Sequence, residues 1–271
     1  MLASLLITFR ESLEASLIIG IILAFLIKTK REKYNNIVYL GVVAAIIASI
    51  GTAFLFNALS IQFEGLAEQI FEGVAMLIAA GMLTYMIIWM KKQKGVTADI
   101  QHKVSAELDS GKKAGLFFLA FIAVFREGVE TVLFLGAAKI SGGGDNVFLG
   151  AFIGIVLAII LGYMLFVSSK HINLKKFFHV TSLLLILFAA GLTAHGVHEF
   201  QEAGSIPIIK EHVWDINPEL NEDGSYPAMH EKGSVGSIFK GLFGYNGNPN
   251  LLEVMAYLLY LGVVLFFFYK E

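Results

Sequence analysis

The sequence contains no cysteine, and this absence excludes disulfide bonds, thiolate metal sites, iron–sulfur clusters and cysteine nucleophiles together. Charge is also scarce, because only 15% of the 271 residues are Asp, Glu, Lys or Arg, whereas about a quarter is usual in soluble domains. The net charge of −2 leaves no basic excess of the kind that nucleic-acid-binding proteins carry. No P-loop pattern occurs, so the chain shows no ATP-driven motor.

Apolar residues dominate what is present, at 56% of the chain, and the mean hydropathy is +0.72. Apolar stretches of about 20 residues, the length that crosses a bilayer, occur seven times, at roughly 2–27, 37–59, 65–90, 114–138, 147–168, 177–199 and 251–269. The first stretch carries Arg10 and Glu11 and lacks a basic leader, so we interpret it as a retained span rather than a signal peptide. The sequence predicts an all-α polytopic membrane protein, with residues 1–271 forming a single membrane domain.

Basic residues alternate between the loops that join these stretches. The loops after the first, third and fifth stretches are rich in lysine, whereas the long loop at about 201–250 is acidic and holds all four prolines. Because cytoplasmic loops carry the excess of Lys and Arg, we predict an outer N-terminus, an inner C-terminus and an irregular extracytoplasmic loop. The stretch from Thr97 to Lys113 spaces Ile100, Val104 and Leu108 four apart, which predicts an amphipathic connecting helix on the membrane or on the bundle.

Two short sequences recur in the same order. Residues 9–14 read FRESLE and residues 125–130 read FREGVE, while AAGMLT at 79–84 is echoed by AAGLT at 189–193. We therefore predict one repeat at about 1–90 and a second at about 114–200, with the seventh span at about 251–269 added. Three spans is an odd number, so the second unit enters the membrane from the opposite side. This arrangement is the inverted repeat of many transporters, whose binding sites lie near the midplane.

The FRE motif places one arginine and two glutamates inside each repeat: Arg10, Glu11 and Glu14 in the first, and Arg126, Glu127 and Glu130 in the second. Each buried charge costs on the order of 2.5–3.5 kcal/mol at the bilayer centre, and an ion pair at i, i+4 within each helix offsets part of that cost. Purely structural salt bridges would need only one acid for each arginine. Two facing motifs carry four carboxylates and a charge of −2, which calls for a cation.

The depth of both motifs agrees with a shared site. Glu11 lies about nine residues, or about 14 Å, into the first stretch, and Glu127 lies about thirteen residues, or about 20 Å, into the fourth from the other side. Both positions are near the centre of a hydrocarbon core that is about 30 Å thick.

Further acids and histidines are expected at the outer face. Glu64, Glu68 and Glu72 lie four apart at the start of the third stretch, and they indicate either a cation-attracting ladder or, for Glu64 above all, a solvated helix start. The sixth stretch ends with a group of ligand-type residues: His195, His198, Glu199 and Glu202. Imidazole with carboxylate suits iron, zinc or manganese, although a single interfacial histidine is usually a polar cap. The stripe of Met82, Met86 and Met90 is more typical of packing than of a copper site.

The motifs RESLE (10–14), REGVE (126–130) and HEFQEAG (198–204) resemble those of the high-affinity iron permeases, the oxidase-dependent iron transporters of fungi and bacteria. The resemblance covers essentially the whole chain, with Ser12 in place of the usual glycine. It implies an iron permease of the plasma membrane, in bacteria the inner membrane, with Glu11, Glu14, Glu127 and Glu130 as iron ligands. It implies Fe²⁺ or Fe³⁺ as the transported ion, no permanent cofactor, and a separate extracytoplasmic iron-binding, oxidase or peroxidase partner.

Two other functions are compatible with the same residues. A carboxylate site also suits manganese or another divalent cation, in a permease or an exchanger, and Glu-x-x-Glu patterns occur in di-iron enzymes built on helical bundles. The expected separation between the outer histidines and the midplane acids argues against the enzyme. The GxxxG pattern from Gly150 to Gly154 suits either internal packing or a homo-oligomer.

Overall fold

The computed structural model describes residues 1–92, 96–109, 113–143, 146–167, 174–221 and 223–270, and within these residues it contains helices and no strand. The long helices are α1 (Leu2–Lys28), α2 (Asn35–Gln62), α3 (Leu66–Lys92), α5 (Lys113–Ala138), α6 (Asn146–Val167), α7 (Leu174–Glu202) and α9 (Leu251–Lys270). Shorter elements are η1 (Glu32–Tyr34), α4 (Val96–Asp109), η2 (Lys139–Gly143) and α8 (Gly236–Phe243). All seven predicted apolar stretches coincide with a long helix to within a few residues.

The all-α membrane class is confirmed. In the described part of the chain, five helices are long and apolar enough to cross a membrane: α2, α3, α6, α7 and α9. The helices α1 and α5 have 27 and 26 residues, and they differ from the other five in carrying the three charges of the motif. The chain is a multi-pass membrane protein.

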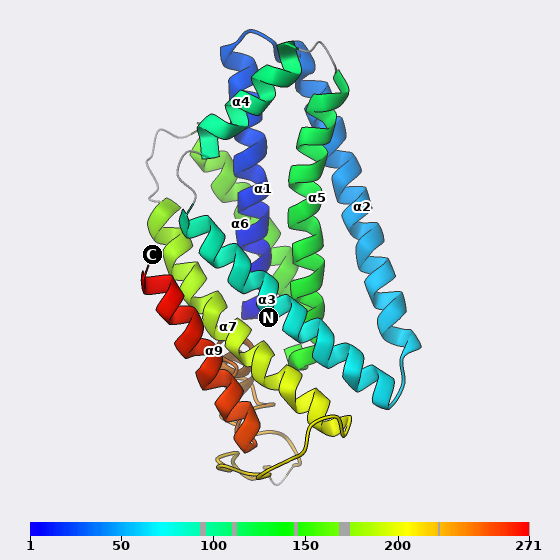
Figure 1. Cartoon of the computed structure of the whole chain (residues 1–271), viewed down its shortest axis with the longest axis vertical. Coiled ribbons are helices and arrows are strands. Elements are labelled where there is room, and N and C mark those ends of the chain that lie inside the picture. Colours follow the sequence, from blue (N-terminus) through cyan, green and yellow to red (C-terminus); the bar gives the residue numbers. More distant parts are fainter. Residues whose placement is uncertain (93–95, 110–112, 144–145, 168–173, 222, 271) are drawn as a thin grey trace.

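The long helices pack in pairs that correspond between the two predicted repeats (Figure 1). Helix α1 packs against α6 and α2 against α5, while α1 also contacts α5, and α3 lies along α7. If α1, α2 and α3 are exchanged with α5, α6 and α7, respectively, the α1–α6 pair becomes the α5–α2 pair. The α1–α5 and α3–α7 pairs are unchanged by the same exchange. This is the pattern that an inverted repeat would produce. Helix α9 has no counterpart and packs on α7.

Glycines allow the paired helices to approach closely. A Cβ atom added at Gly154 of α6 would lie 2.1 Å from Thr8 Oγ1 of α1, and one at Gly41 of α2 would lie 2.6 Å from the Phe117 carbonyl oxygen of α5. The Thr8 hydroxyl donates to the Ala151 carbonyl at 3.0 Å across the first contact. The GxxxG pattern of α6 therefore serves internal packing against α1.

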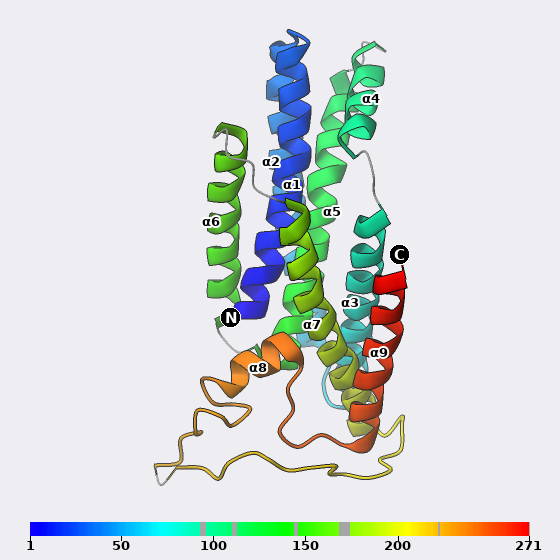
Figure 2. The ribbon, with the colours of Figure 1, turned by 90° about the vertical axis from the view of Figure 1, so that its left-hand side faces the viewer.

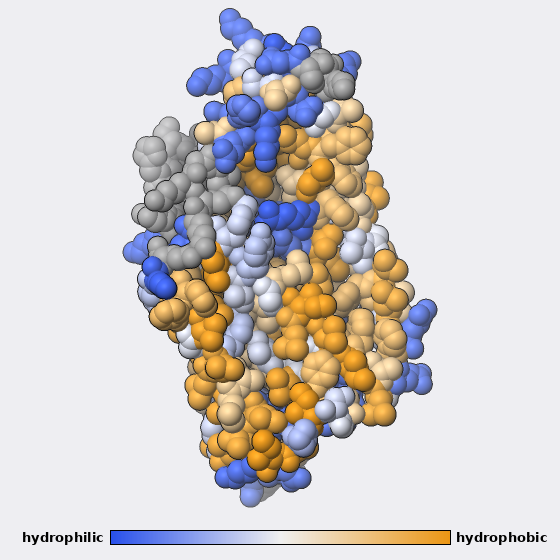
Figure 3. All heavy atoms as spheres, viewed as in Figure 1, coloured by the Kyte–Doolittle hydropathy of each residue, from blue (hydrophilic) through white to orange (hydrophobic). Residues whose placement is uncertain are grey.

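Apolar side chains occupy both the interior and the lateral surface. On the lateral face of α2, Leu40, Ile47 and Phe54 are 61%, 65% and 73% exposed. Figure 3 shows a broad apolar surface between hydrophilic ends, as expected for a surface that faces lipid. Val104 and Leu108 of α4 are buried against α1, α2 and α5, so the predicted amphipathic helix lies on the bundle.

The loop between α7 and α9 contains one helix that the sequence analysis did not predict. Helix α8 packs against α7, α1 and η2 and lies across the loop-bearing end of the bundle (Figure 2). It ends at Gly244, whose φ of 66° is left-handed. The backbone of Gly244 meets α7 at Gly191, where an added Cβ would lie 2.5 Å from the Gly244 Cα. The loop is thereby anchored to the membrane helices.

Candidate metal-binding site

The four motif glutamates gather at the contact between α1 and α5. Their residues are almost wholly buried, with exposed fractions of 1% for Glu11, 9% for Glu14, 3% for Glu127 and 7% for Glu130. Carboxylate oxygens from Glu11, Glu14 and Glu127 lie within 4.8 Å of one another, and no other group of three His, Cys, Asp or Glu residues is this tight among the described residues. Two helices from the two predicted repeats thus contribute to one acidic cluster.

Each arginine binds the glutamates of its own helix, and both expected i, i+4 ion pairs are present. Arg10 Nη2 lies 3.0 Å from Glu14 Oε1, and Arg126 Nε lies 2.9 Å from Glu130 Oε1. The second acid of each motif is also engaged, because Arg10 Nη1 lies 3.1 Å from Glu11 Oε1 and Arg126 Nε lies 3.8 Å from Glu127 Oε1. One oxygen of every motif carboxylate therefore faces an arginine.

The second oxygen of most of these carboxylates has no partner. Glu11 Oε2, Glu127 Oε2 and Glu130 Oε2 are buried without a hydrogen bond. A buried polar group left unsatisfied costs about 1–3 kcal/mol, and more when it is charged. The cluster therefore presents oxygen atoms of the kind that hard cations bind.

Helix α3 contacts both arginines near its C-terminal end. Arg10 Nη1 and Nη2 lie 2.9 Å from Met86 Sδ and 2.6 Å from Met90 Sδ, and the Arg126 guanidinium lies 5.0 Å from the centre of the Trp89 ring. The Arg10 side chain is 0% exposed, whereas that of Arg126 is 40% exposed. The methionine stripe thus includes two arginine contacts, and sequence reasoning missed Trp89 because nothing in the spacing relates it to Arg126.

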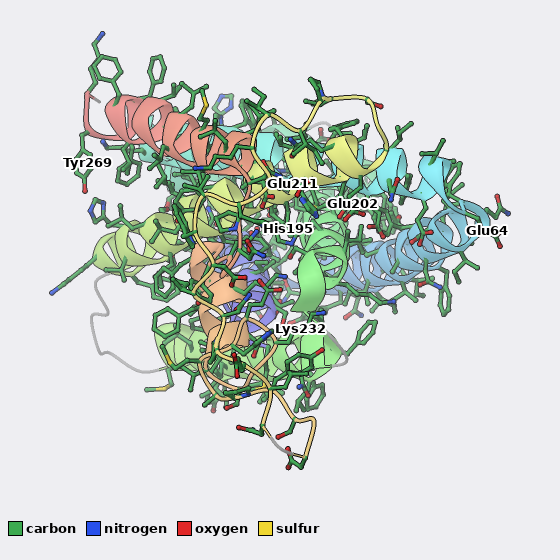
Figure 4. All side chains as sticks on the ribbon, turned by 90° about the horizontal axis from the view of Figure 1, so that it is seen from below. Glu64, His195, Glu202, Glu211, Lys232 and Tyr269 are labelled. Atoms are coloured by element: carbon green, nitrogen blue, oxygen red, sulfur yellow. The ribbon has the colours of Figure 1, made fainter. Side chains whose placement is uncertain are left out.

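At the end of the bundle that carries the long loop, α3 and α7 meet at two glycines. A Cβ added at Gly73 would lie 3.1 Å from the Gly196 carbonyl oxygen, and this close approach brings Glu72 near Glu199. Glu199 interacts electrostatically with Glu72, Glu202 and Glu68. The expected mouth residues on α3 and α7 are therefore neighbours. Figure 4 shows that Glu64 lies at the edge of the bundle, away from Glu202, so it stands apart from this group.

His198 is held between two carboxylates. Its Nε2 lies 3.1 Å from Glu202 Oε1, and its Nδ1 lies 3.0 Å from Glu253 Oε1. Glu253, which is 3% exposed, also accepts hydrogen bonds from Asn246 Nδ2 at 2.7 Å and Asn250 Nδ2 at 2.6 Å. Sequence reasoning missed Glu253 because a single acid at the start of an apolar span carries no motif.

His195 lies one turn before His198 and has different neighbours. It lines a small pocket together with Lys240 of α8, and the two His rings are 6.2 Å apart between centroids. In Figure 4, which views the bundle from the end that carries the long loop, His195 lies toward the middle. The four residues expected to form one group on α7 therefore have different neighbours: His195 lies beside Lys240 of α8, whereas His198 contacts Glu253 of α9.

A bundle of apolar helices that encloses a cluster of carboxylates is the architecture of a membrane protein whose buried side chains offer oxygen ligands of the kind that hard cations take. The chain belongs to the iron permease FTR1 family, which it matches over residues 1–270. It is similar to the ferrous iron permease EfeU of Yersinia pestis, with 35% identity over 98% of this chain and 93% of the relative. It is also similar to the ferrous iron permease EfeU of Escherichia coli strain CFT073, with 33% identity over 96% and 92%. No solved structure matches the chain.

Proposed function

We propose that this protein imports iron across the plasma membrane, in bacteria the inner membrane, and that Glu11, Glu14, Glu127 and Glu130 bind the ion on its path. The observation that carries this proposal is the set of buried carboxylate oxygens that face no hydrogen-bond donor. An ion pair that served packing alone would leave no such atoms. Membership of the iron permease family supports iron as the ion.

The charge of the cluster favours Fe²⁺. Four glutamates and two arginines sum to −2, so one divalent ion leaves the buried site neutral and a trivalent ion leaves it positive. Uncompensated charge in a low-dielectric interior is strongly unfavourable. The relatives named ferrous iron permeases agree with this choice.

The proposed topology has seven spans, with α1 and α5 crossing the membrane beside the five more apolar helices. Their motif charges pair with one another inside the bundle. The lysine-bearing turn between α1 and α2 lies with α4 at one end of the molecule, and the acidic loop lies at the other (Figure 1). By the positive-inside rule this arrangement has an outer N-terminus and an inner C-terminus.

The transport path begins at the acids and the histidine of α3 and α7: Glu68, Glu72, His198, Glu199 and Glu202. A separate extracytoplasmic iron-binding, oxidase or peroxidase protein supplies iron to this mouth. The ion then passes to the midplane cluster between the two inverted repeats. The membrane potential favours inward movement by about 2.3 kcal/mol per charge per 100 mV, or about 4.6 for Fe²⁺.

Sealed proteoliposomes provide the test. Wild-type protein should take up Fe²⁺ under anaerobic conditions, whereas Glu14→Gln and Glu130→Gln, which remove one charge and keep the shape, should abolish uptake. Glu32→Gln, an exposed acid of η1, is the matched control and should transport normally. Offering Fe³⁺ and Mn²⁺ separately distinguishes the ion. Normal uptake by a correctly inserted Glu130→Gln variant would refute the site, and tight resident iron without flux would favour a metalloenzyme.

A further inference from the structure

A single segment of α3 contacts the arginines of both motifs. Met86 and Met90 place their sulfur atoms against the two terminal nitrogens of Arg10, and Trp89, between them in sequence, lies under the Arg126 guanidinium. Neither contact belongs to the Arg-Glu-x-x-Glu motif. The two arginines lie on different helices, α1 and α5, and α3 contacts both of them.

These contacts determine the position and orientation of the Arg10 guanidinium. An arginine has five N–H donors, and Arg10 directs Nη1 and Nη2 at glutamates of its own helix, while its Nε has no partner. The remaining directions of the two terminal nitrogens are filled by thioether sulfurs, which are weak acceptors. The sulfurs fix the orientation of the guanidinium without competing with the carboxylates for it.

Trp89 has the corresponding effect on Arg126. The Arg126 side chain is 40% exposed, so water could draw its guanidinium away from the glutamates. An aromatic face within about 6 Å attracts a guanidinium and stacks on its plane. The ring therefore holds Arg126 in the orientation in which Nε reaches Glu130.

We propose that Met86, Trp89 and Met90 are positioning residues for the iron ligands, acting through Arg10 and Arg126. Each arginine lies beside the Oε1 atoms of its own glutamates. The Oε2 atoms of Glu11, Glu127 and Glu130, together with Glu14 Oε1, are buried without a hydrogen bond. Rotation of either guanidinium would turn the carboxylates and move the oxygens that bind the ion. This inference rests on the proposed function of the carboxylate cluster.

The first experiment measures Fe²⁺ uptake by anaerobic proteoliposomes. Trp89→Leu removes the aromatic face and should lower uptake at limiting iron by about three- to tenfold, which lies within the range of a cation–π contact. Trp89→Phe keeps an aromatic face and should stay within about twofold of wild type. Tyr85→Leu is the matched control, because Tyr85 lies on the same helix and is 67% exposed, and the aromatic ring on Arg126 is that of Trp89. Equal losses in the Leu and Phe variants would overturn the role of Trp89.

The methionines allow an independent test with nearly unchanged side-chain volume. The double variant Met86→Leu/Met90→Leu removes both sulfur acceptors and should lower uptake, whereas Met82→Leu, also on α3 and packed against the core, should not. If the double variant transports like wild type, the sulfurs do not position Arg10.

A double-mutant comparison separates positioning from packing. Equilibrium binding of Fe²⁺ to purified protein is measured anaerobically for wild type, Trp89→Leu, Arg126→Gln and the Arg126→Gln/Trp89→Leu combination. If Trp89 acts through Arg126, Trp89→Leu weakens Fe²⁺ binding in the wild-type background. In the Arg126→Gln background, the same substitution changes Fe²⁺ binding by less than about twofold. Equal weakening in both backgrounds would mean that Trp89 only packs. The proposed function is tested separately, by Fe²⁺ uptake through the wild-type protein and through the Glu14→Gln and Glu130→Gln variants.

Discussion

The two motif arginines have the same sequence context and different surroundings, and this difference predicts unequal effects on stability. Arg10 is 0% exposed and binds two carboxylates that are themselves buried, whereas the Arg126 side chain is 40% exposed. Removing one partner of a buried ion pair costs about 3–5 kcal/mol, because the partner charge is left without compensation. Arg126 also leaves buried carboxylates behind when it is removed, but water reaches the position of its own side chain and can partly replace it.

We therefore expect Arg10→Gln to lower the free energy of unfolding by about 3–5 kcal/mol and Arg126→Gln to lower it by a smaller amount. Reversible unfolding in mixed micelles of detergent and SDS, followed by circular dichroism, gives both values. Arg10→Lys keeps the charge and loses the planar fork, so its loss should be smaller than that of Arg10→Gln. Equal losses for the two Gln variants, or a larger loss at Arg126, would refute the reasoning from burial.

Three further predictions concern other parts of the molecule. Alanine at Glu68, Glu72 or Glu199 should raise the iron concentration for half-maximal uptake more than it lowers the maximal rate; the opposite pattern would place these acids in the translocation step. Gly154→Leu should prevent α6 from packing on α1, because the new side chain would meet Thr8 and the Leu5 carbonyl. The control Gly262→Ala, with nothing within 4 Å, should yield wild-type amounts of monodisperse protein. Similar yields of the two variants would contradict the α1–α6 contact. Glu253→Ala removes one acceptor from each of two asparagine amides and from His198. It should lower the free energy of unfolding by about 1–3 kcal/mol, and an unchanged free energy would show that the network contributes nothing.

The helices could be predicted from the sequence because each depends on local properties. Apolar length alone located the stretches that became α1, α2, α3, α5, α6, α7 and α9, and the spacing of Ile100, Val104 and Leu108 located α4. Spacing within one helix also determined the pairs of Arg10 with Glu14 and of Arg126 with Glu130. The helix α8 was not predicted, because its sequence GSIFKGLF contains two glycines and its stability comes from contacts with α7 and α1.

Contacts between distant parts of the chain could not be read from the sequence. Glu253 and His198 are 55 residues apart, and no periodicity relates them. The ambiguity of the GxxxG pattern was resolved only by the position of α6 against α1. For the same reason the methionine stripe indicated packing, and its contact with Arg10 depends on how α3 crosses α1.

The central claim is that iron reaches the buried carboxylates and leaves them on the other side of the membrane. Single cysteines at Ala15 or Thr131, each one residue beyond its motif, can be labelled selectively because the chain has no cysteine of its own. In proteoliposomes of known orientation, small polar thiol reagents should react with these cysteines from both sides, and Fe²⁺ should protect them. Labelling from one side only, unaffected by iron, would contradict transport through this site.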